Sequence, residues 1–117
     1  MLQPPAARVL ERSDNKVELS LPLTDDFPCF VGHFDGLPVL AGVVQIGWAL
    51  HLAEHYFARK FQFQALQSNK FQQLVRPPIT LHLTLQYLPQ KQMVKFHYRN
   101  GLGDCSRGAL RVEELPA

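Results

Sequence analysis

The stretch FVGHFDGLPVLAGVVQIGWALHLAEH, residues 30–55, decides the fold of this 117-residue chain. It places His33 between glycine and phenylalanine, and two turns rich in proline and glycine follow before a long apolar run. The run, residues 43–58, is long enough for an α-helix of about four turns. Apolar residues occur almost all round it, which is typical of a buried helix. The sequence therefore predicts a long helix enclosed by the rest of the protein.

Much of the remaining chain alternates between apolar and polar residues, as half-buried β-strands do. The predicted strands are residues 16–23, 79–87, 93–99 and 106–114, with a weaker candidate at 66–78. Pro22 places the first of these strands at an edge or at a strand end. One early helix followed by consecutive antiparallel strands predicts a single α+β domain over residues 1–117. In this domain a curved antiparallel sheet wraps around one long buried helix.

The composition excludes several classes of protein. Hydrophobic residues make up 46% of the chain, so a packed core is expected and disorder is not. No apolar stretch reaches the roughly 18–20 residues of a membrane span, and no secretory signal is recognisable. The two cysteines, Cys29 and Cys105, are expected to be free thiols in a cytoplasmic protein.

Charge is unevenly distributed along the chain. Residues 1–58 carry three basic and seven acidic side chains, whereas residues 59–111 carry nine basic side chains and one acid, Asp104. The basic half is either a solvated strand face or a surface that attracts an acidic partner. Nucleic acid is the less favoured partner, because no dense Lys/Arg cluster or nucleic-acid motif is present.

The segment GHFDGLPVLAGVV, residues 32–44, resembles the start of the hotdog-fold β-hydroxyacyl-acyl-carrier-protein dehydratases. PVLAGVVQ, residues 38–45, is more similar to the ApeI-like dehydratases of aryl polyene biosynthesis. KFQQLVRPP (70–78) and CSRGALRV (105–112) also match that family, so the resemblance covers about residues 16–113. It implies a hotdog fold, a homodimer or a heterodimer of hotdog subunits, and no cofactor. The implied activity is dehydration of a 3-hydroxyacyl thioester held on an acyl carrier protein, in fatty-acid or aryl polyene biosynthesis.

The resemblance also implies roles for individual residues. His33 matches the family's catalytic base, a role that suits an imidazole with a pKa near neutrality. Gly42, at the helix start, matches the backbone N–H donor to the thioester oxygen, and Val39 and Val43 are expected substrate contacts. The family's catalytic acid, fourteen residues after the histidine, falls on Gly47, which has no side chain to donate a proton.

Two residues are candidates for the missing acid. His51 follows Gly47 by one helical turn on the same helix face, although it could equally be a neutral histidine bonded within the core. Asp35 lies in the loop of His33, at a position where the family has proline. Without a certain acid, three functions stay open: a dehydratase, a hydrolase of acyl thioesters, and a non-catalytic subunit that pairs with an active one.

A zinc hydrolase is the remaining alternative. HLAEH, residues 51–55, matches the H-x-x-E-H pattern, in which two histidines bind zinc and the glutamate acts as a base. A third ligand would have to come from Glu113 or Glu114, and such enzymes usually have longer chains. We therefore expect no bound metal, with the HLAEH face packed inside the sheet.

Overall fold

The computed structural model describes residues 3–24 and 40–116. Within them the chain forms one α-helix, one short 3₁₀ helix and a set of β-strands. In chain order these are β1 (Arg8–Arg12), β2 (Lys16–Leu23), α1 (Gly42–Phe57), β3 (Phe61–Phe71), β4 (Ile79–Leu88), η2 (Pro89–Lys91), β5 (Met93–Asn100) and β6 (Gly103–Glu114).

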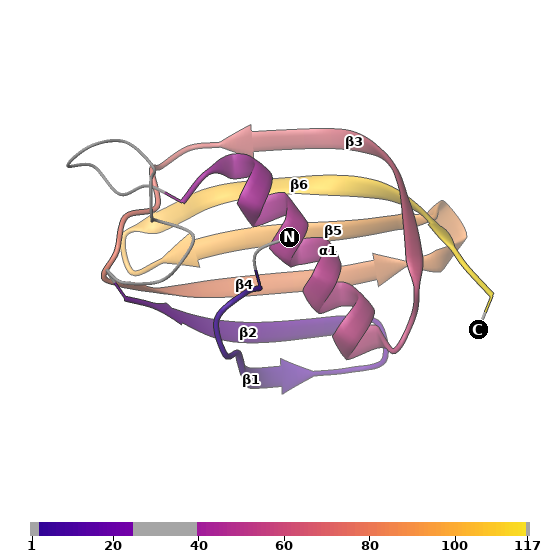
Figure 1. The fold of residues 1–117 in the computed structure, drawn as a ribbon, viewed down its shortest axis with the longest axis horizontal. Helices are drawn as coiled ribbons and strands as arrows, with labels where there is room; N and C mark the ends of the chain where they lie inside the picture. The colour runs from indigo at the N-terminus through magenta and orange to yellow at the C-terminus, as the bar shows by residue number, and fades with distance from the viewer. Residues whose placement is uncertain (1–2, 25–39, 117) are drawn as a thin grey trace.

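The strands form one antiparallel sheet in the order β1-β2-β4-β5-β6-β3 (Figure 1). Its register follows from the alternation in the sequence. Leucines and valines that pair across neighbouring strands project from the same face of the sheet. The fully buried pairs between β2 and β4 are Val17 with Leu85, Leu19 with Leu83, and Leu21 with Leu81. A one-residue slip would move all these side chains to the other face, so burial fixes the register.

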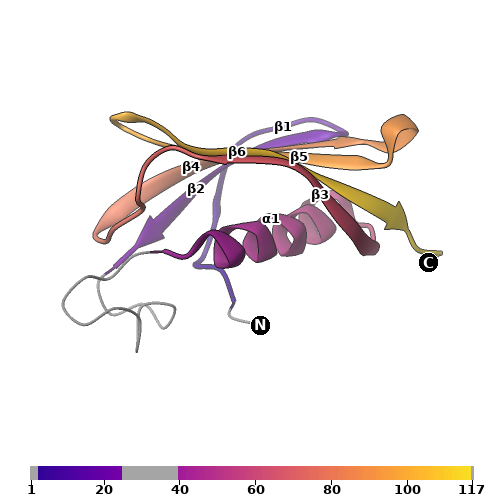
Figure 2. The same ribbon diagram turned by 90° about the horizontal axis from the view of Figure 1, so that it is seen from above.

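Helix α1 packs against one face of the sheet, and the sheet curves around it (Figure 2). Trp48, Ala49, Leu52 and Ala53 recur at helical spacing and are buried against the strands. On the outward side Val43 is 76% exposed. One sheet covers only one side of a helix, so within the single chain the predicted buried helix is covered on its sheet side and only partly on its outward side. The antiparallel sheet wrapped around one long helix is confirmed.

The N-terminal residues lie on the side of α1 that faces away from the sheet, as the two views show (Figures 1 and 2). There Pro5 is buried, and Ala7 packs against the core. Among the described residues, this segment covers only part of the outward side of the helix, where Val43 is mostly exposed.

The edge strands differ from the prediction. Strand β1 was not expected, and β3 begins at Phe61, five residues before the predicted start. Every residue of β1 is exposed, and Phe61 is the one buried residue of β3. Strand β1, RVLER, has no apolar alternation and therefore could not be predicted from that pattern. The first residues of β3, FQFQA, do alternate, and the prediction missed this signal. Pro22 lies beyond the residues of β2 that pair with β1, as expected for a proline at a strand end.

Of the two cysteines, Cys105 is a free, buried thiol, as expected, whereas Cys29 lies outside the described residues. Among the described helices, none is long and apolar enough to cross a membrane.

Candidate active site

The predicted site residues fall in two groups. His33, Asp35 and Val39 lie outside the described residues, so their roles stay predictions. The others, Gly42, Val43 and His51, all lie on α1. The structure places Gly42 and Val43 together in the first turn of the helix.

Within the part of the chain that the structure describes, the start of α1 has no side-chain cap. Ala41 precedes the helix in an extended conformation, with φ −63° and ψ 146°, and its side chain makes no capping hydrogen bond. The Val44 and Gln45 N–H groups donate to the Ala41 carbonyl oxygen at 3.1 Å, which leaves the Gly42 and Val43 N–H groups without an acceptor among the described residues. The first turn carries no acidic side chain. Because Val43 is mostly exposed, these donors, at the positive end of the helix dipole, suit a carbonyl oxygen that gains negative charge.

Gly42 also has a packing role. A Cβ atom at this position would come within 2.8 Å of the Phe71 ring, at the end of β3. The absence of a side chain therefore lets the helix start lie against that ring. Phe71 is 45% exposed, so its ring has room to turn. The glycine thus serves close packing, and this does not conflict with a role for its N–H group.

A buried hydrogen-bond network around Gln45 fixes the helix start to the sheet. Its amide donates to the carbonyl oxygen of Leu40 at 3.0 Å, and its Oε1 accepts from the Ser106 hydroxyl of β6 at 2.6 Å. The Tyr98 hydroxyl of β5 donates to the Gln45 backbone oxygen at 2.6 Å. The Leu40 N–H donates to Val75 at 2.8 Å. The network thus anchors the first residue after the undescribed segment, which contains His33.

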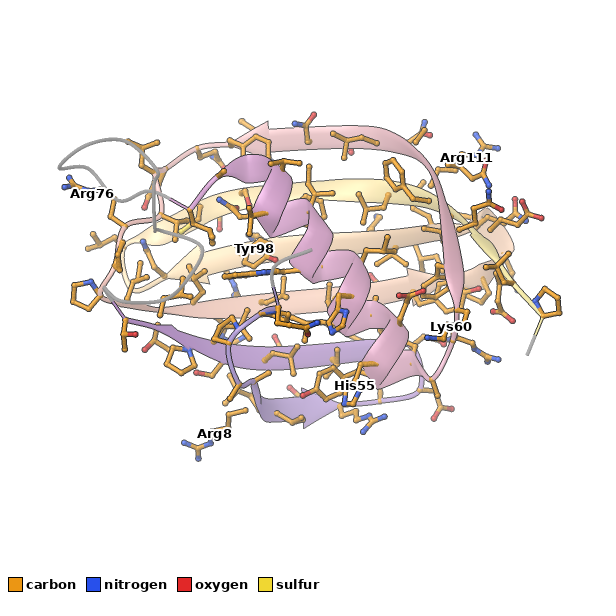
Figure 3. All side chains as sticks on the ribbon, viewed as in Figure 1. Arg8, His55, Lys60, Arg76, Tyr98 and Arg111 are labelled. Atoms are coloured by element: carbon orange, nitrogen blue, oxygen red, sulfur yellow. The ribbon has the colours of Figure 1, made fainter. Side chains whose placement is uncertain are left out.

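Gln45 is 3% exposed and Ser106 is fully buried. Figure 3 shows Tyr98 beneath α1, and burial raises the pKa of its hydroxyl well above the usual range. A neutral, donating Tyr98 is therefore the stable form. Sequence reasoning missed this network. The one signal in the sequence was Gln45 itself, a polar residue at the start of the apolar helix. A buried amide must find hydrogen-bond partners, so its position indicated such a network.

Gly47 and His51 lie on the side of α1 away from its buried residues, and both are half-buried. His51 lines a hollow of about 490 Å³ at the C-terminal end of the helix, together with Glu54, His55 and Glu114. Nine residues separate it from Gly42, which is about 13 Å along the helix axis. The structure therefore does not bring His51 next to the open helix start of its own chain. Its role as the acid stays a prediction.

The predicted burial of the HLAEH face is wrong. His55 is exposed (Figure 3), and its ring packs edge-on against Tyr56, with 4.7 Å between the ring centroids. Glu54 has a structural task, because its carboxylate accepts the Phe61 N–H at 2.9 Å, where β3 begins. In the part of the chain that the structure describes, no three His, Cys, Asp or Glu side chains are grouped as metal ligands.

Comparison with known proteins identifies the family. The model of the ApeI-like family, described as ApeI dehydratase, matches residues 9–109. The chain belongs to the ApeI-like dehydratase family. The match extends over nearly all the strands described above and includes α1, as the resemblance in the sequence implied.

Solved structures agree with this assignment. The dehydratase heterocomplex ApeI:P from Xenorhabdus doucetiae is 28% identical, with a TM-score of 0.86 over 92% of this chain and 96% of that chain. An uncharacterized protein from Erwinia carotovora subsp. atroseptica is 30% identical, with a TM-score of 0.81 over 98% of both chains. A comparison with curated proteins found no match.

A hypothetical thioesterase protein from Streptococcus pneumoniae, solved with coenzyme A, is 7% identical, with a TM-score of 0.73 over 96% of this chain and 90% of that chain. At that identity the likeness concerns the fold alone. This ApeI-like chain therefore has the hotdog fold, a fold that dehydratases and thioesterases share.

Two glycines of the chain give a matched test of packing. We expect Gly42→Ala to change the free energy of unfolding by less than about 0.5 kcal/mol, because the half-exposed Phe71 ring can turn aside. Gly108→Ala should cost about 1–3 kcal/mol. Its Cβ would meet the Ser68 backbone oxygen, which cannot swing away, as well as the Phe96 ring at 2.8 Å.

Urea unfolding at one fixed protein concentration measures both variants, with Gly101→Ala as the control, since a Cβ there meets nothing within 4 Å. Equal losses for Gly42→Ala and Gly108→Ala would contradict this reading of the two sites.

Proposed function

We propose that this chain dehydrates 3-hydroxyacyl thioesters carried on an acyl carrier protein, giving the 2-enoyl thioester and water. The observation that supports this most strongly is the family match over residues 9–109 together with the open helix start at Gly42. The ApeI-like family is a dehydratase family, and a thioester carbonyl needs such N–H donors when charge develops on its oxygen.

The proposed reaction assigns one task to each group. His33 removes a proton from C2 of the substrate, and the electron pair forms the C2–C3 double bond as the C3 hydroxyl leaves. The N–H groups of Gly42 and Val43 stabilise the negative charge that develops on the thioester oxygen. A general acid protonates the departing hydroxyl, which leaves as water. No electrons are gained or lost overall, so the residues of the chain suffice without a redox cofactor.

The acid is the unusual part of this site. Position 47 carries glycine, so the proton must come from another side chain. We assign it to His51 on the helix of a second subunit, because within one chain His51 lies about 13 Å from Gly42. His51 shares the outward side of α1 with Gly47 and is half-buried beside a hollow. The missing side chain at Gly47 leaves room for a substrate hydroxyl or for a water molecule between that hydroxyl and the imidazole.

Assembly with a second hotdog subunit is part of the proposal. Strand β3 is a long edge strand, and Phe63, Leu66 and Phe71 on it are between 37% and 46% exposed. Phe63 and Leu66 lie opposite the buried Val112 and Leu110 of β6, so they point to the side of the sheet that carries α1. A long apolar edge strand is a template for pairing with another chain. A partner at β3 would bury Phe63 and Leu66 beside the half-covered helix.

A non-catalytic subunit is the second candidate function, and Gly47 is the observation that favours it. The structure from Xenorhabdus doucetiae is described as a dehydratase heterocomplex. In a heterocomplex of this kind a partner chain would supply the acid, and this chain, which has glycine at position 47, would be the supporting subunit.

Single substitutions test the catalytic assignment. His33→Ala should remove nearly all turnover of a 3-hydroxyacyl-carrier substrate, and His51→Gln should lower it by about 10²–10⁴-fold, the usual value of a positioned acid or base. Gly47→Glu in the His51→Gln background should restore part of the loss. His55→Gln, the same change on the exposed histidine of α1, is the control and should keep the wild-type rate. Mass spectrometry of the carrier-bound product measures all four variants.

Two results would change the assignment. Wild-type turnover by His51→Gln together with an inactive Asp35→Asn would make the loop aspartate the acid. If the wild-type protein produces no enoyl product from any such substrate, the non-catalytic candidate replaces the dehydratase.

A charge on the edge strand tests the assembly. We expect the wild-type chain to be a dimer at micromolar concentration, and Phe63→Glu with Leu66→Glu to give a folded monomer, because two carboxylates would be buried unpaired in the interface. Light scattering measures the mass, and circular dichroism checks the fold. Leu102→Glu, in the turn between β5 and β6 and 88% exposed, is the control and should stay dimeric. A monomeric wild-type chain would contradict the proposal.

A further inference from the structure

The face of the sheet opposite α1 carries a hollow of about 450 Å³. Figure 2 shows that α1 lies on the other face, so this hollow is separate from the candidate active site. Its size falls within the range of small-molecule sites, roughly 300–1,000 Å³.

The register of the strands builds this hollow from two neighbouring cross-strand rows. The first row, from β2 to β3, is Lys16, Gln86, Lys95, Ala109 and Ser68; the second is Glu18, Thr84, His97, Arg107 and Lys70. All of these residues except Glu18 line the hollow. The short side chains of Ala109 and Ser68 lie between long basic ones, and neighbouring strands are only about 4.8 Å apart. The small residues therefore form a floor, and the basic side chains surround it.

The charge of the hollow is positive. Lys16, Lys70, Lys95 and Arg107 line it, and none of the described residues that line it carries a carboxylate. Among the described residues none of these four cations forms a salt bridge.

The acids of the same sheet face are already engaged. Glu18 lies 3.4 Å from His82 and 3.6 Å from Arg99, and Asp104 lies 2.8 Å from His97. An ordinary solvated strand face mixes charges of both signs throughout. Here four cations without a salt bridge among the described residues surround the hollow, and His97, paired with Asp104, is the one ion-paired group that lines it.

One contact in the hollow opposes folding. Lys70 lies directly opposite Arg107 in the ladder between β3 and β6, and like charges in that position destabilise a sheet. An anion between these side chains would turn the repulsion into attraction. The neutral donors Ser68, Asn69, Thr84 and Gln86 also line the hollow, and they can complete the hydrogen bonding of phosphate oxygens.

We propose that this outer-face hollow binds a pyrophosphate group, either as the free anion or as part of a nucleoside diphosphate. The argument rests on charge complementarity and on neutral donors beside the cations, and it is independent of the dehydratase activity. A compact dianionic group can meet Lys95, Arg107 and Lys70 together, because these residues lie on three neighbouring strands.

Titration of the full-length protein with inorganic pyrophosphate and with ADP tests the proposal by calorimetry. We expect binding that weakens as salt is added and a rise of the melting temperature with ligand concentration. Lys70→Gln with Arg107→Gln should weaken binding by about tenfold or more, since hydrogen bonds to charged groups contribute strongly. The same pair should not lower the melting temperature without ligand, because it removes a like-charge pair.

Arg8→Gln with Arg76→Gln removes the same charge from exposed positions outside the hollow (Figure 3) and is the matched control. Pyrophosphate binding as tight as ADP binding would identify the phosphates as the recognised part, whereas tighter ADP binding would assign the site to a nucleotide.

Three outcomes would overturn the proposal. They are no binding of either probe at millimolar concentration, equal losses in both double variants, and binding of a short polyglutamate peptide as tight as that of pyrophosphate with the same dependence on Lys70 and Arg107. The last result would assign the hollow to an acidic protein segment instead.

Discussion

The buried amide of Gln45 is the interaction on which the arrangement of this protein depends. It joins the start of α1 to β6 through Ser106 and to the segment before the helix through Leu40. The Tyr98 hydroxyl of β5 donates a hydrogen bond to the backbone oxygen of Gln45. An amide at 3% exposure without partners would cost about 1–3 kcal/mol. The pairing therefore favours the one position of the helix over the sheet in which all these groups meet.

This anchor determines what the helix presents to a substrate. The sheet side of α1 is held by Trp48 and its neighbours. The N–H groups of its first turn point along the helix axis, and Ala41 provides them with no side-chain cap. The outward side, which carries Gly47 and His51, is only partly covered. The half-covered helix and the edge strand β3 leave apolar side chains exposed in the single chain, among them Val43, Phe63 and Leu66. The proposed second subunit would cover these apolar side chains.

The sequence predicts those parts of the fold in which burial alternates along the chain. The predicted strands at 16–23, 79–87 and 93–99 agree with β2, β4 and β5 to within one residue at each end, and the helix is shifted by one residue. Strand β1 carries no such alternation, because it is exposed at the edge of the sheet. The first residues of β3, FQFQA, do alternate, but the prediction began this strand only at residue 66.

The candidate site was predicted less completely, for a different physical reason. The resemblance located the helix start at Gly42, but the partners of Gln45 on β5 and β6 are 53 and 61 residues away in the chain. No local pattern reports such distant contacts. Whether HLAEH faces the core or the solvent also depends on which side of the helix the sheet covers. Spacing alone does not decide that when both sides are apolar.

A double-mutant cycle between Gln45 and Ser106 tests the central claim most directly. The free energies of unfolding are measured for the wild type, Gln45→Met, Ser106→Ala and the double variant at one protein concentration. If the buried hydrogen bond joins the helix to the sheet, the two substitutions are non-additive, with a coupling of about 0.5–3 kcal/mol. Losses that add to within about 0.3 kcal/mol would contradict the account, because they would mean that the two side chains act independently.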